Sequence, residues 1–169
     1  MPETHSPVWF EPPDRKPVVL QAGEGPAINA RARRIVKASD ELTKGRFALH
    51  VVSCEAGYQG PPLHIHQRND EAFFVLEGNL RFRVGEETVT VGPGGFVFVP
   101  AGTAHSFAND SEEASRHIEL FAPGDFEGYF FERAALQAEG KLGPERDALL
   151  EKYGMVVVGP SIGKVGDDA

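Results

Sequence analysis

The sequence predicts one small all-β domain, an antiparallel barrel or sandwich, followed by a short helical segment. The chain has 169 residues and is 41% hydrophobic, with 12 phenylalanines, so it can bury one continuous core without disulfides. Its 19 glycines and 13 prolines indicate many turns. Between them, apolar residues recur in short runs with a period of two, which is typical of half-buried antiparallel strands.

Residues 1–32 are expected to form an extended N-terminal arm. Prolines interrupt the first 26 residues and disfavour a regular element there, at Pro2, Pro7, Pro12, Pro13, Pro17 and Pro26. A short basic cluster of Arg31, Arg33 and Arg34 follows. We interpret it as a solvated strand edge rather than a phosphate site or a dimer contact, because charges commonly protect sheet edges.

Residues 33–122 are expected to form the barrel. The predicted strands are residues 34–38, 47–54, 72–76, 80–84, 88–91, 96–99, 105–108 and 117–121. The connections at residues 77–79 and 85–87 each contain a glycine and are short enough for hairpins. No interval of ten to fifteen residues between Arg34 and Phe121 has the helical period, which excludes parallel βαβ crossovers there.

Residues 123–169 are expected to add helices and a tail that pack on the barrel, so that the whole chain is one domain. Asp125 is placed to cap a helix that ends before Gly140, with apolar positions at Phe126, Tyr129, Phe130 and Ala134. We interpret this apolar face as core packing or a lid seat rather than a cofactor-binding motif. A second helix is predicted from Pro144 to before Gly154, and residues 155–158 could add a strand to a partner subunit.

The charge and cysteine content exclude several classes of function. The net charge is -8 and the basic residues are otherwise scattered, so no nucleic-acid partner is expected. Cys54 is the single cysteine, which excludes an intrachain disulfide and a cysteine-based zinc site. Residues 1–17 lack the apolar core of a signal peptide, and no apolar run is long enough to cross a bilayer. These features predict a soluble, cytoplasmic protein without a membrane partner.

Three histidines and one glutamate are spaced for binding a metal ion. His64 and His66 are two residues apart in an extended segment, so both side chains project from the same face. A tight turn after His66 could bring the carboxylate of Glu71 back beside them, and His105 begins another strand. This donor set suits one divalent transition metal ion: iron, manganese, nickel, zinc, cobalt or copper.

These residues resemble the two sequence motifs of the cupin superfamily. In the first motif, four residues separate His66 from Glu71, and six residues separate Glu71 from Gly78. Tyr58 departs from this motif, since the family places a glycine there. The second motif matches at every position, with Gly94, Pro100, Gly102, His105 and Asn109 at the family spacing. The motifs span residues 57–109, and the flanking strands extend the likeness to about residue 121.

The resemblance implies a cupin double-stranded β-helix, or jelly-roll barrel, with the metal ion held by His64, His66, Glu71 and His105. Asn109 is equally compatible with ending its strand in an Asx-turn and with supporting the site. His50, Cys54 and His117 have no spaced partners, and we interpret them as structural residues.

Period two places Phe73, Val75, Phe107 and Phe82 on the inner wall beside the expected metal ion. Such a wall suits a small, hydrophobic and possibly aromatic molecule as substrate. A sugar or a dicarboxylate would need more inward polar groups than the pattern offers. Cupins of this size are often dimers, and exposed strand edges could be buried in a symmetric pair, so we expect a homodimer.

Three functions remain open, since one fold can carry unrelated chemistry. The first is a metal-dependent dioxygenase in which Glu71 is both ligand and catalytic proton acceptor; residues 123–130 resemble the tail of small bacterial quercetinase-like cupins, which favours an enolisable aromatic substrate. The second is a non-redox isomerase, cyclase or decarboxylase of a keto or polyketide-like compound. The third is a non-catalytic small-molecule or metal-binding barrel.

Overall fold

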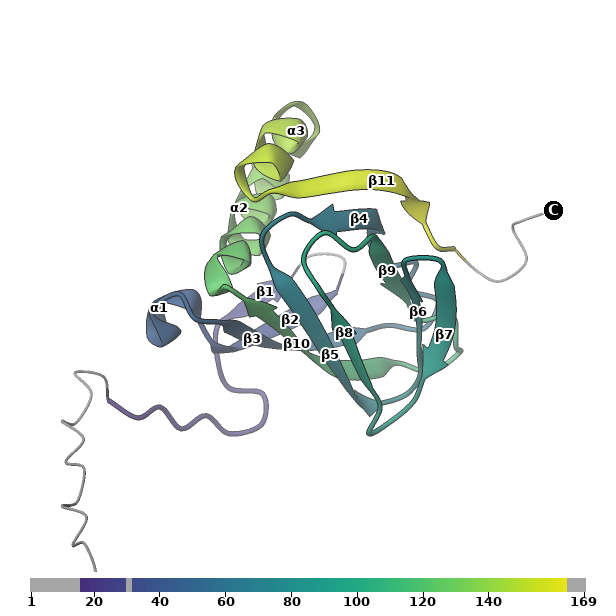
Figure 1. The fold of residues 1–169 in the computed structure, drawn as a ribbon. Coiled ribbons are helices and arrows are strands. Elements are labelled where there is room, and N and C mark those ends of the chain that lie inside the picture. Colours follow the sequence, from purple (N-terminus) through teal and green to yellow (C-terminus); the bar gives the residue numbers. More distant parts are fainter. Residues whose placement is uncertain (1–15, 30–31, 164–169) are drawn as a thin grey trace, which may run out of the picture.

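The computed structural model describes residues 16–29 and 32–163, which form two facing antiparallel β-sheets with helices at one end (Figure 1). The six-stranded sheet has the order β1-β2-β3-β10-β5-β8. Its strands are β1 (Ala27–Asn29), β2 (Arg33–Ala38), β3 (Ala48–Cys54), β10 (Ser115–Ala122), β5 (Asp70–Glu77) and β8 (Phe96–Val99). A short helix, α1 (Asp40–Thr43), connects β2 to β3.

The second sheet has five strands in the order β11-β4-β9-β6-β7. These strands are β11 (Met155–Ser161), β4 (Pro62–His66), β9 (His105–Ala108), β6 (Leu80–Val84) and β7 (Glu87–Val91). Every strand pairing in both sheets is antiparallel, which confirms the all-β fold class. The eight predicted strands are present, with ends that differ by at most two residues.

Alternation of side chains fills the space between the sheets. In β3 the even-numbered residues from Ala48 to Cys54 are buried and the odd-numbered ones are partly exposed. The same period in the neighbouring strands builds one hydrophobic cluster inside the barrel, made of Ala32, Val52, Cys54, Phe73, Val75, Leu80, Phe82, Val99 and Phe107. Burial of these large side chains is the main favourable contribution to folding.

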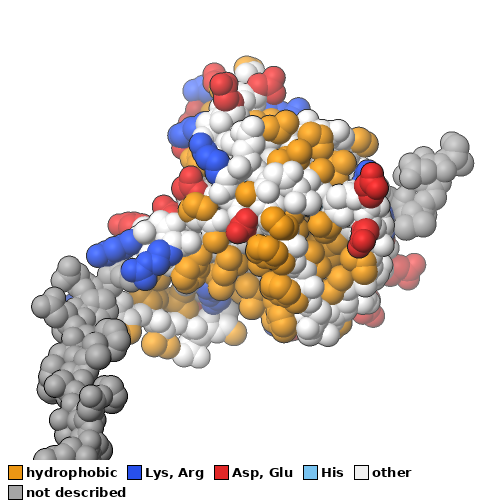
Figure 2. All heavy atoms as spheres, viewed as in Figure 1, with side chains coloured by type: hydrophobic (Ala, Val, Ile, Leu, Met, Phe, Trp, Pro, Cys, Tyr) orange, Lys and Arg blue, Asp and Glu red, His pale blue; other side chains and the backbone are white. Residues whose placement is uncertain are grey.

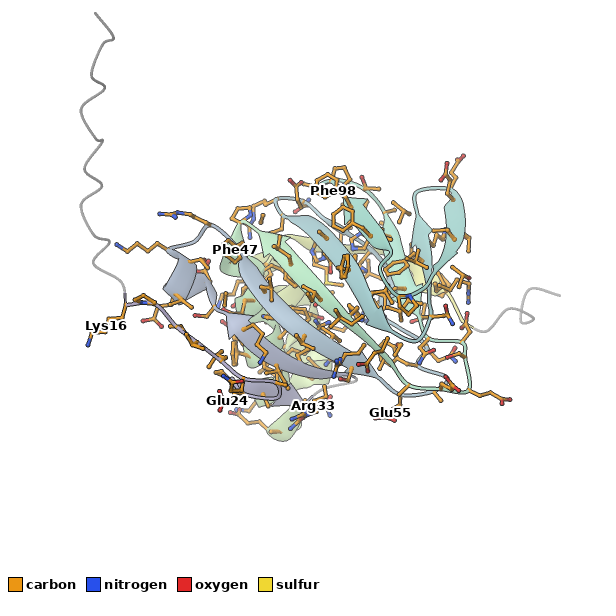
Figure 3. All side chains as sticks on the ribbon, turned by 90° about the horizontal axis from the view of Figure 1, so that it is seen from below. Lys16, Glu24, Arg33, Phe47, Glu55 and Phe98 are labelled. Carbon is orange, nitrogen blue, oxygen red and sulfur yellow. The ribbon has the colours of Figure 1, made fainter. Side chains whose placement is uncertain are left out.

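The outer face of β5 and β8 is unusually apolar (Figure 2). Phe74 pairs with Phe96 in the sheet register, and Ala72 pairs with Phe98, so the three phenylalanines share one face. The exposed fractions of Phe74, Phe96 and Phe98 are 41%, 62% and 52%. Phe98 lies at the surface in the view from below (Figure 3). Because β8 is an edge strand, this apolar face continues to an unpaired sheet edge in the described chain.

The C-terminal part folds back onto one end of the barrel (Figure 1). It contains a 3-10 turn, η1 (Gly124–Phe126), then α2 (Glu127–Ala138), α3 (Leu142–Lys152) and strand β11. Its second apolar cluster consists of Phe121, Phe126, Leu149, Tyr153 and Met155. The expected apolar helix face therefore packs against the barrel.

Two details of this segment differ from the sequence prediction. Asp125 does not cap α2, since the N-cap residue is Phe126 without a side-chain bond; the Asp125 carboxylate instead accepts a hydrogen bond from the Asn69 amide at 2.7 Å. Strand β11 pairs with β4 of the same chain rather than with a partner subunit. The turn at Gly154 permits this pairing, with φ at +63° and its carbonyl bonded to the amide of Gln67.

The N-terminal segment also departs from a simple arm. Within the expected residues 1–32, Ala27–Asn29 forms the edge strand β1, which pairs with β2 and buries Ile28. Residues 1–15 lie outside the described residues. No helix in the described ranges combines the length and apolar character needed to span a bilayer.

Candidate metal centre

The four predicted metal ligands converge from both sheets. His64 and His66 come from β4 and His105 from β9, in the five-stranded sheet, while Glu71 comes from β5 in the six-stranded sheet. His64 and His105 are direct partners in the register of β4 and β9. The site therefore depends on both sheets being correctly placed relative to each other.

The donor atoms of the four side chains all lie within 4.8 Å of one another, and all four residues are buried. The Nε2 atoms of His64 and His66 are 3.2 Å apart. One carboxylate oxygen of Glu71 lies 2.7 Å from the Nε2 atom of His105 and 3.2 Å from the Nε2 atom of His66.

Backbone carbonyls orient two of the three imidazoles. The Nδ1 atom of His64 donates to the carbonyl of Pro62 at 2.8 Å, and the Nδ1 atom of His105 donates to the carbonyl of Thr103 at 2.9 Å. In the neutral imidazoles, the Nε2 atoms therefore carry the lone pairs that point into the cluster. The Nδ1 atom of His66 has no hydrogen-bond partner in the described chain, and its ring packs 4.1 Å from the ring of Phe126.

Burial and neighbouring charge set the protonation of the cluster. Burial, followed by the nearby imidazoles of His105 and His66, lowers the pKa of His64 to about 3. Burial alone would raise the pKa of Glu71, but hydrogen bonds from His105 and His66 outweigh it and hold that pKa well below its usual range. For His105, burial lowers the pKa, whereas the hydrogen bond to Glu71 raises it, and the net shift is upward.

The arrangement fits a bound cation. Imidazole lone pairs face each other and face a carboxylate at hydrogen-bonding distance, so their mutual repulsion must be offset by a proton or a metal ion. Three neutral imidazoles and one carboxylate are ligands that divalent transition metals prefer. A metal ion bound here would be held by His64, His66, Glu71 and His105.

The loops next to the ligands are held by close backbone contacts. Gly60 has φ at +75°, and a Cβ atom there would lie 1.6 Å from the carbonyl oxygen of Phe107, so only glycine fits before β4. The amide of Gly102 donates to the carbonyl of His66 at 2.8 Å, and the amide of Ala101 donates to the carboxylate of Asp70 at 2.9 Å. These bonds tie the loop before His105 to the strands that carry the other ligands.

Comparison with known proteins identifies the fold. Residues 50–121, which contain all four ligands, match the Cupin_2 family model, described as a cupin domain. This chain carries a cupin domain. The recognition from the two sequence motifs is thereby confirmed.

The cupin also resembles individual proteins. It is 36% identical over 118 residues to quercetin 2,3-dioxygenase of Bacillus subtilis, a match that covers 68% of this chain and 34% of that enzyme. The chain spans about a third to a half of the length of the curated relatives it matches.

Among solved structures, the Cnp3 cupin domain of Schizosaccharomyces pombe superposes with a TM-score of 0.55 at 24% identity, covering 65% of this chain and 77% of that one. A predicted oxalate decarboxylase from Thermotoga maritima superposes with a TM-score of 0.57 at 18% identity, covering 63% and 99%. At these identities the two structures support the cupin fold alone.

A cavity of about 750 Å³ opens beside the ligand cluster of the cupin. His64, His66 and Glu71 lie in its wall. Of the predicted wall residues, Phe107 lines the cavity. Phe73, Val75 and Phe82 lie instead in the hydrophobic cluster inside the barrel, where the rings of Phe73 and Phe82 pack 5.4 and 6.0 Å from the ring of Phe107.

Most of the remaining wall comes from the C-terminal segment, whose contribution the strand pattern did not indicate. Aromatic and aliphatic side chains from η1, α2, α3 and β11 face the cavity, namely Phe126, Tyr129, Phe130, Leu142, Leu149, Leu150, Met155 and Val157. The helices therefore cover the open end of the barrel above the ligand cluster. The apolar helix face, for which core packing or a lid seat is expected, thus packs on the barrel and also lines the cavity.

Arg34 and Glu119 form a buried ion pair in the cavity wall, and the sequence analysis missed it. The basic cluster is expected to be a solvated edge. Arg33 is exposed (Figure 3), but Arg34 is buried, since its partner in β3 is the core residue Val52, and Arg31 lies outside the described residues. Glu119 could have been found, since it alternates with His117 and Phe121 on the inward face of a predicted strand, where an unpaired carboxylate would be costly.

The residues interpreted as structural lie outside the cavity wall in the described chain. His50 pairs with Glu127 at 3.1 Å, and burial lowers its pKa. Burial raises the pKa of the Cys54 thiol to about 12, so the thiol stays protonated. Asn109 forms the Asx-turn, accepting from the amide of Ser111 at 3.2 Å, and its amide group donates to the carbonyls of Cys54, Glu55 and Glu113.

Proposed function

We propose that this cupin is a metal-dependent dioxygenase that acts on a small hydrophobic or aromatic substrate with an enolisable or phenolic oxygen. The observation that carries the proposal is the position of the ligand cluster: two of its three buried imidazoles and its carboxylate lie in the wall of a cavity that is also lined by aromatic side chains. The 36% identity to quercetin 2,3-dioxygenase of Bacillus subtilis over 118 residues supports the same class of reaction. Because this chain covers 34% of that enzyme, the identity supports a reaction class and not a particular substrate.

The proposed cofactor is one divalent transition metal ion bound by His64, His66, Glu71 and His105. When bound, such an ion supplies a Lewis acid for an ionised enol or phenol oxygen and, if redox-active, allows the substrate to be oxidised while O2 is reduced and both of its atoms enter the product. Glu71 would accept the proton that the substrate loses. Its carboxylate is anionic and lies in the cavity wall, so a substrate oxygen can reach it.

The cavity has the size and lining for an aromatic ligand. Small-molecule sites typically enclose about 300–1,000 Å³ and are lined mainly by apolar and aromatic groups. Phe107, Phe121, Phe126, Tyr129 and Phe130 all line this cavity of about 750 Å³. The α2 and α3 helices would exclude bulk water from the reacting atoms.

Oxygen consumption tests the proposal. Protein loaded with iron, nickel or manganese is mixed with a panel of flavonols and other enolisable aromatics in an oxygen electrode. We expect uptake of one O2 per substrate consumed with at least one metal. The Glu71→Gln variant should lose more activity than metal, because the amide can still ligate but cannot accept the proton. No uptake with any metal would refute the oxygenase assignment.

A non-redox metalloenzyme is the second candidate, because the same donor set also suits zinc. It would isomerise or cyclise a keto compound with the ion acting only as a Lewis acid. Turnover by the zinc-loaded protein without oxygen would select this function. Ligands that bind and are recovered unchanged with every metal would instead leave a non-catalytic binding protein.

A further inference from the structure

The cavity contains a second polar element besides the metal ligands. Arg34 on β2 is 7% exposed and Glu119 on β10 is 1% exposed, and the two form an ion pair across the intervening strand β3. Both line the cavity. A buried charge pair costs more in desolvation than an apolar pair of the same volume, so stability alone does not account for it.

The guanidinium of Arg34 has more donors than those that face Glu119. Its two terminal nitrogens face the two carboxylate oxygens of Glu119, with one contact at 3.3 Å. This end-on pairing uses two of the five N–H bonds of an arginine. The remaining N–H bonds belong to a side chain that lines the cavity, where a ligand oxygen can reach them. A buried donor needs a hydrogen-bond partner, and a ligand oxygen in the cavity can supply one.

Two side chains fix the position of Arg34. Its central carbon lies 3.9 Å from the centre of the Phe130 ring, which covers one face of the guanidinium plane. Glu119 holds the end of the side chain. The remaining edge presents Nε–H and an adjacent N–H in parallel, which is the geometry that binds a carboxylate through both oxygens.

We propose that Arg34 binds a carboxylate of the substrate, so that the cavity selects enolisable aromatic or hydrophobic acids over neutral compounds. Glu119 is the positioning residue that orients the guanidinium. The inference deepens the proposed function, on which it rests for the metal-bound end of the substrate. It also revises the expectation that the pocket lacks inward polar groups.

The charge of the cavity wall supports an anionic ligand. Arg133 on α2 and Arg146 on α3 also line the cavity, and neither is paired with a carboxylate within residues 16–29 and 32–163. The acidic groups of the wall, Glu71 and Glu119, are already paired with histidines and with Arg34. The lid of a chain with net charge -8 thus presents unpaired positive charge to the cavity.

A matched pair of probes tests the assignment by calorimetry, without turnover or oxygen. The probes are 2-naphthoate and its neutral counterpart 2-naphthamide, titrated into zinc-loaded protein and into protein stripped with a chelator. We expect the carboxylate to bind at least about tenfold more tightly than the amide in both forms, which is the contribution of one charged hydrogen bond. Equal affinities in the wild-type protein would overturn the proposal.

Arginine variants test whether Arg34 causes the preference for the carboxylate probe. Arg34→Met should abolish it, whereas Arg116→Met, which removes an exposed arginine outside the cavity, should leave it intact. Because Arg34→Met leaves Glu119 buried and unpaired, the double variant Arg34→Met/Glu119→Gln provides a neutral wall if the single variant does not fold. A carboxylate preference that persists in either Arg34 variant would refute the assignment. Since binding is measured directly, this result is independent of whether the protein consumes oxygen.

Discussion

His64 on β4 and His105 on β9 are direct partners in the five-stranded sheet, and their rings lie 4.3 Å apart. Their separation in the chain is 41 residues, yet one register position brings both into the ligand cluster. Each donates its Nδ1 proton to a backbone carbonyl two residues earlier, at Pro62 and Thr103. The same local geometry thus orients two ligands from neighbouring strands.

This relationship predicts a large loss of metal from either histidine variant. His64→Ala and His105→Ala should each weaken binding of zinc by more than the roughly 10–100-fold that follows loss of a group supporting a ligand, because a ligand itself is removed. Equilibrium dialysis followed by metal analysis measures the change. His117→Leu is the matched control, since it removes a buried histidine outside the cluster. Full metal occupancy in both alanine variants would contradict the ligand assignment.

The ligands could be predicted from sequence, two of them by a local rule and two through the resemblance to the cupin motifs. Period two in an extended segment places His64 and His66 on one face, and the spacing to Glu71 and His105 completes the two motifs. Eight of the strands could also be predicted, since alternating apolar residues and turn residues mark them. Gly60 differs, because its restriction to glycine depends on a contact with Phe107, which is distant in the chain, and the sequence pattern does not indicate that contact.

The cavity wall could not be predicted in this way. Phe126 and Phe130 were recognised as one apolar helix face, but period alone does not say which part of the barrel that face covers. Likewise, the apolar pattern of β11 fits pairing with β4 of its own chain and pairing with another chain equally well. The surface assignment of the basic cluster is wrong for Arg34, because its position in β2, opposite the core residue Val52, faces inward.

We expect a homodimer in solution that buries the apolar face of β5 and β8. Phe74, Phe96 and Phe98 are exposed there beside an edge strand, and edges of this kind pair or aggregate unless they are covered. Light scattering on the eluting protein should give twice the monomer mass at micromolar concentration. Phe98→Glu should yield a monomer, while Phe131→Glu on α2, also exposed, should not. A monomeric wild-type protein would contradict this expectation.

His117 should make the fold sensitive to acid. Burial, followed by the charge of Arg34, lowers its pKa to about 3, and neither ring nitrogen has a hydrogen-bond partner in the described chain. The unfolded chain binds a proton near the ordinary histidine pKa of about 6.5, whereas the folded chain does not until about pH 3. Between these values the free energy of unfolding should therefore fall with decreasing pH, by up to about 1.4 kcal/mol per pH unit.

Replacing His117 with leucine isolates this contribution. The leucine side chain is neutral at every pH and needs no hydrogen bonds beside Phe73 and Phe107, whose rings contact His117. Urea titrations from neutral pH down to about pH 4 should show a shallower loss of stability in His117→Leu than in the wild-type protein. The free energies should differ least at neutral pH. Parallel pH profiles for the two proteins would mean that His117 takes up its proton at the same pH in the folded chain as in the unfolded chain.

Gly60 and Gly57 provide a matched test of how β4 is positioned. Both have positive φ, +75° and +70°, so alanine strains the backbone at either position. At Gly57 no atom lies within 4 Å of an added Cβ, and Gly57→Ala should cost about 1 kcal/mol. At Gly60 the added Cβ would collide with the carbonyl of Phe107, so Gly60→Ala should cost about 2–4 kcal/mol.

The backbone shift that relieves the collision in Gly60→Ala should also disturb the metal centre. β4 begins two residues after Gly60 and carries His64 and His66, so relief of the collision moves two ligands relative to Glu71. Urea midpoints measure the loss of stability, and zinc affinity measures the loss of ligand geometry in the fraction that remains folded. We expect Gly60→Ala to weaken zinc binding at least about tenfold, a change of about 1.4 kcal/mol, and Gly57→Ala to leave it unchanged. Equal effects of the two variants on both quantities would show that the contact with Phe107 does not position the ligands.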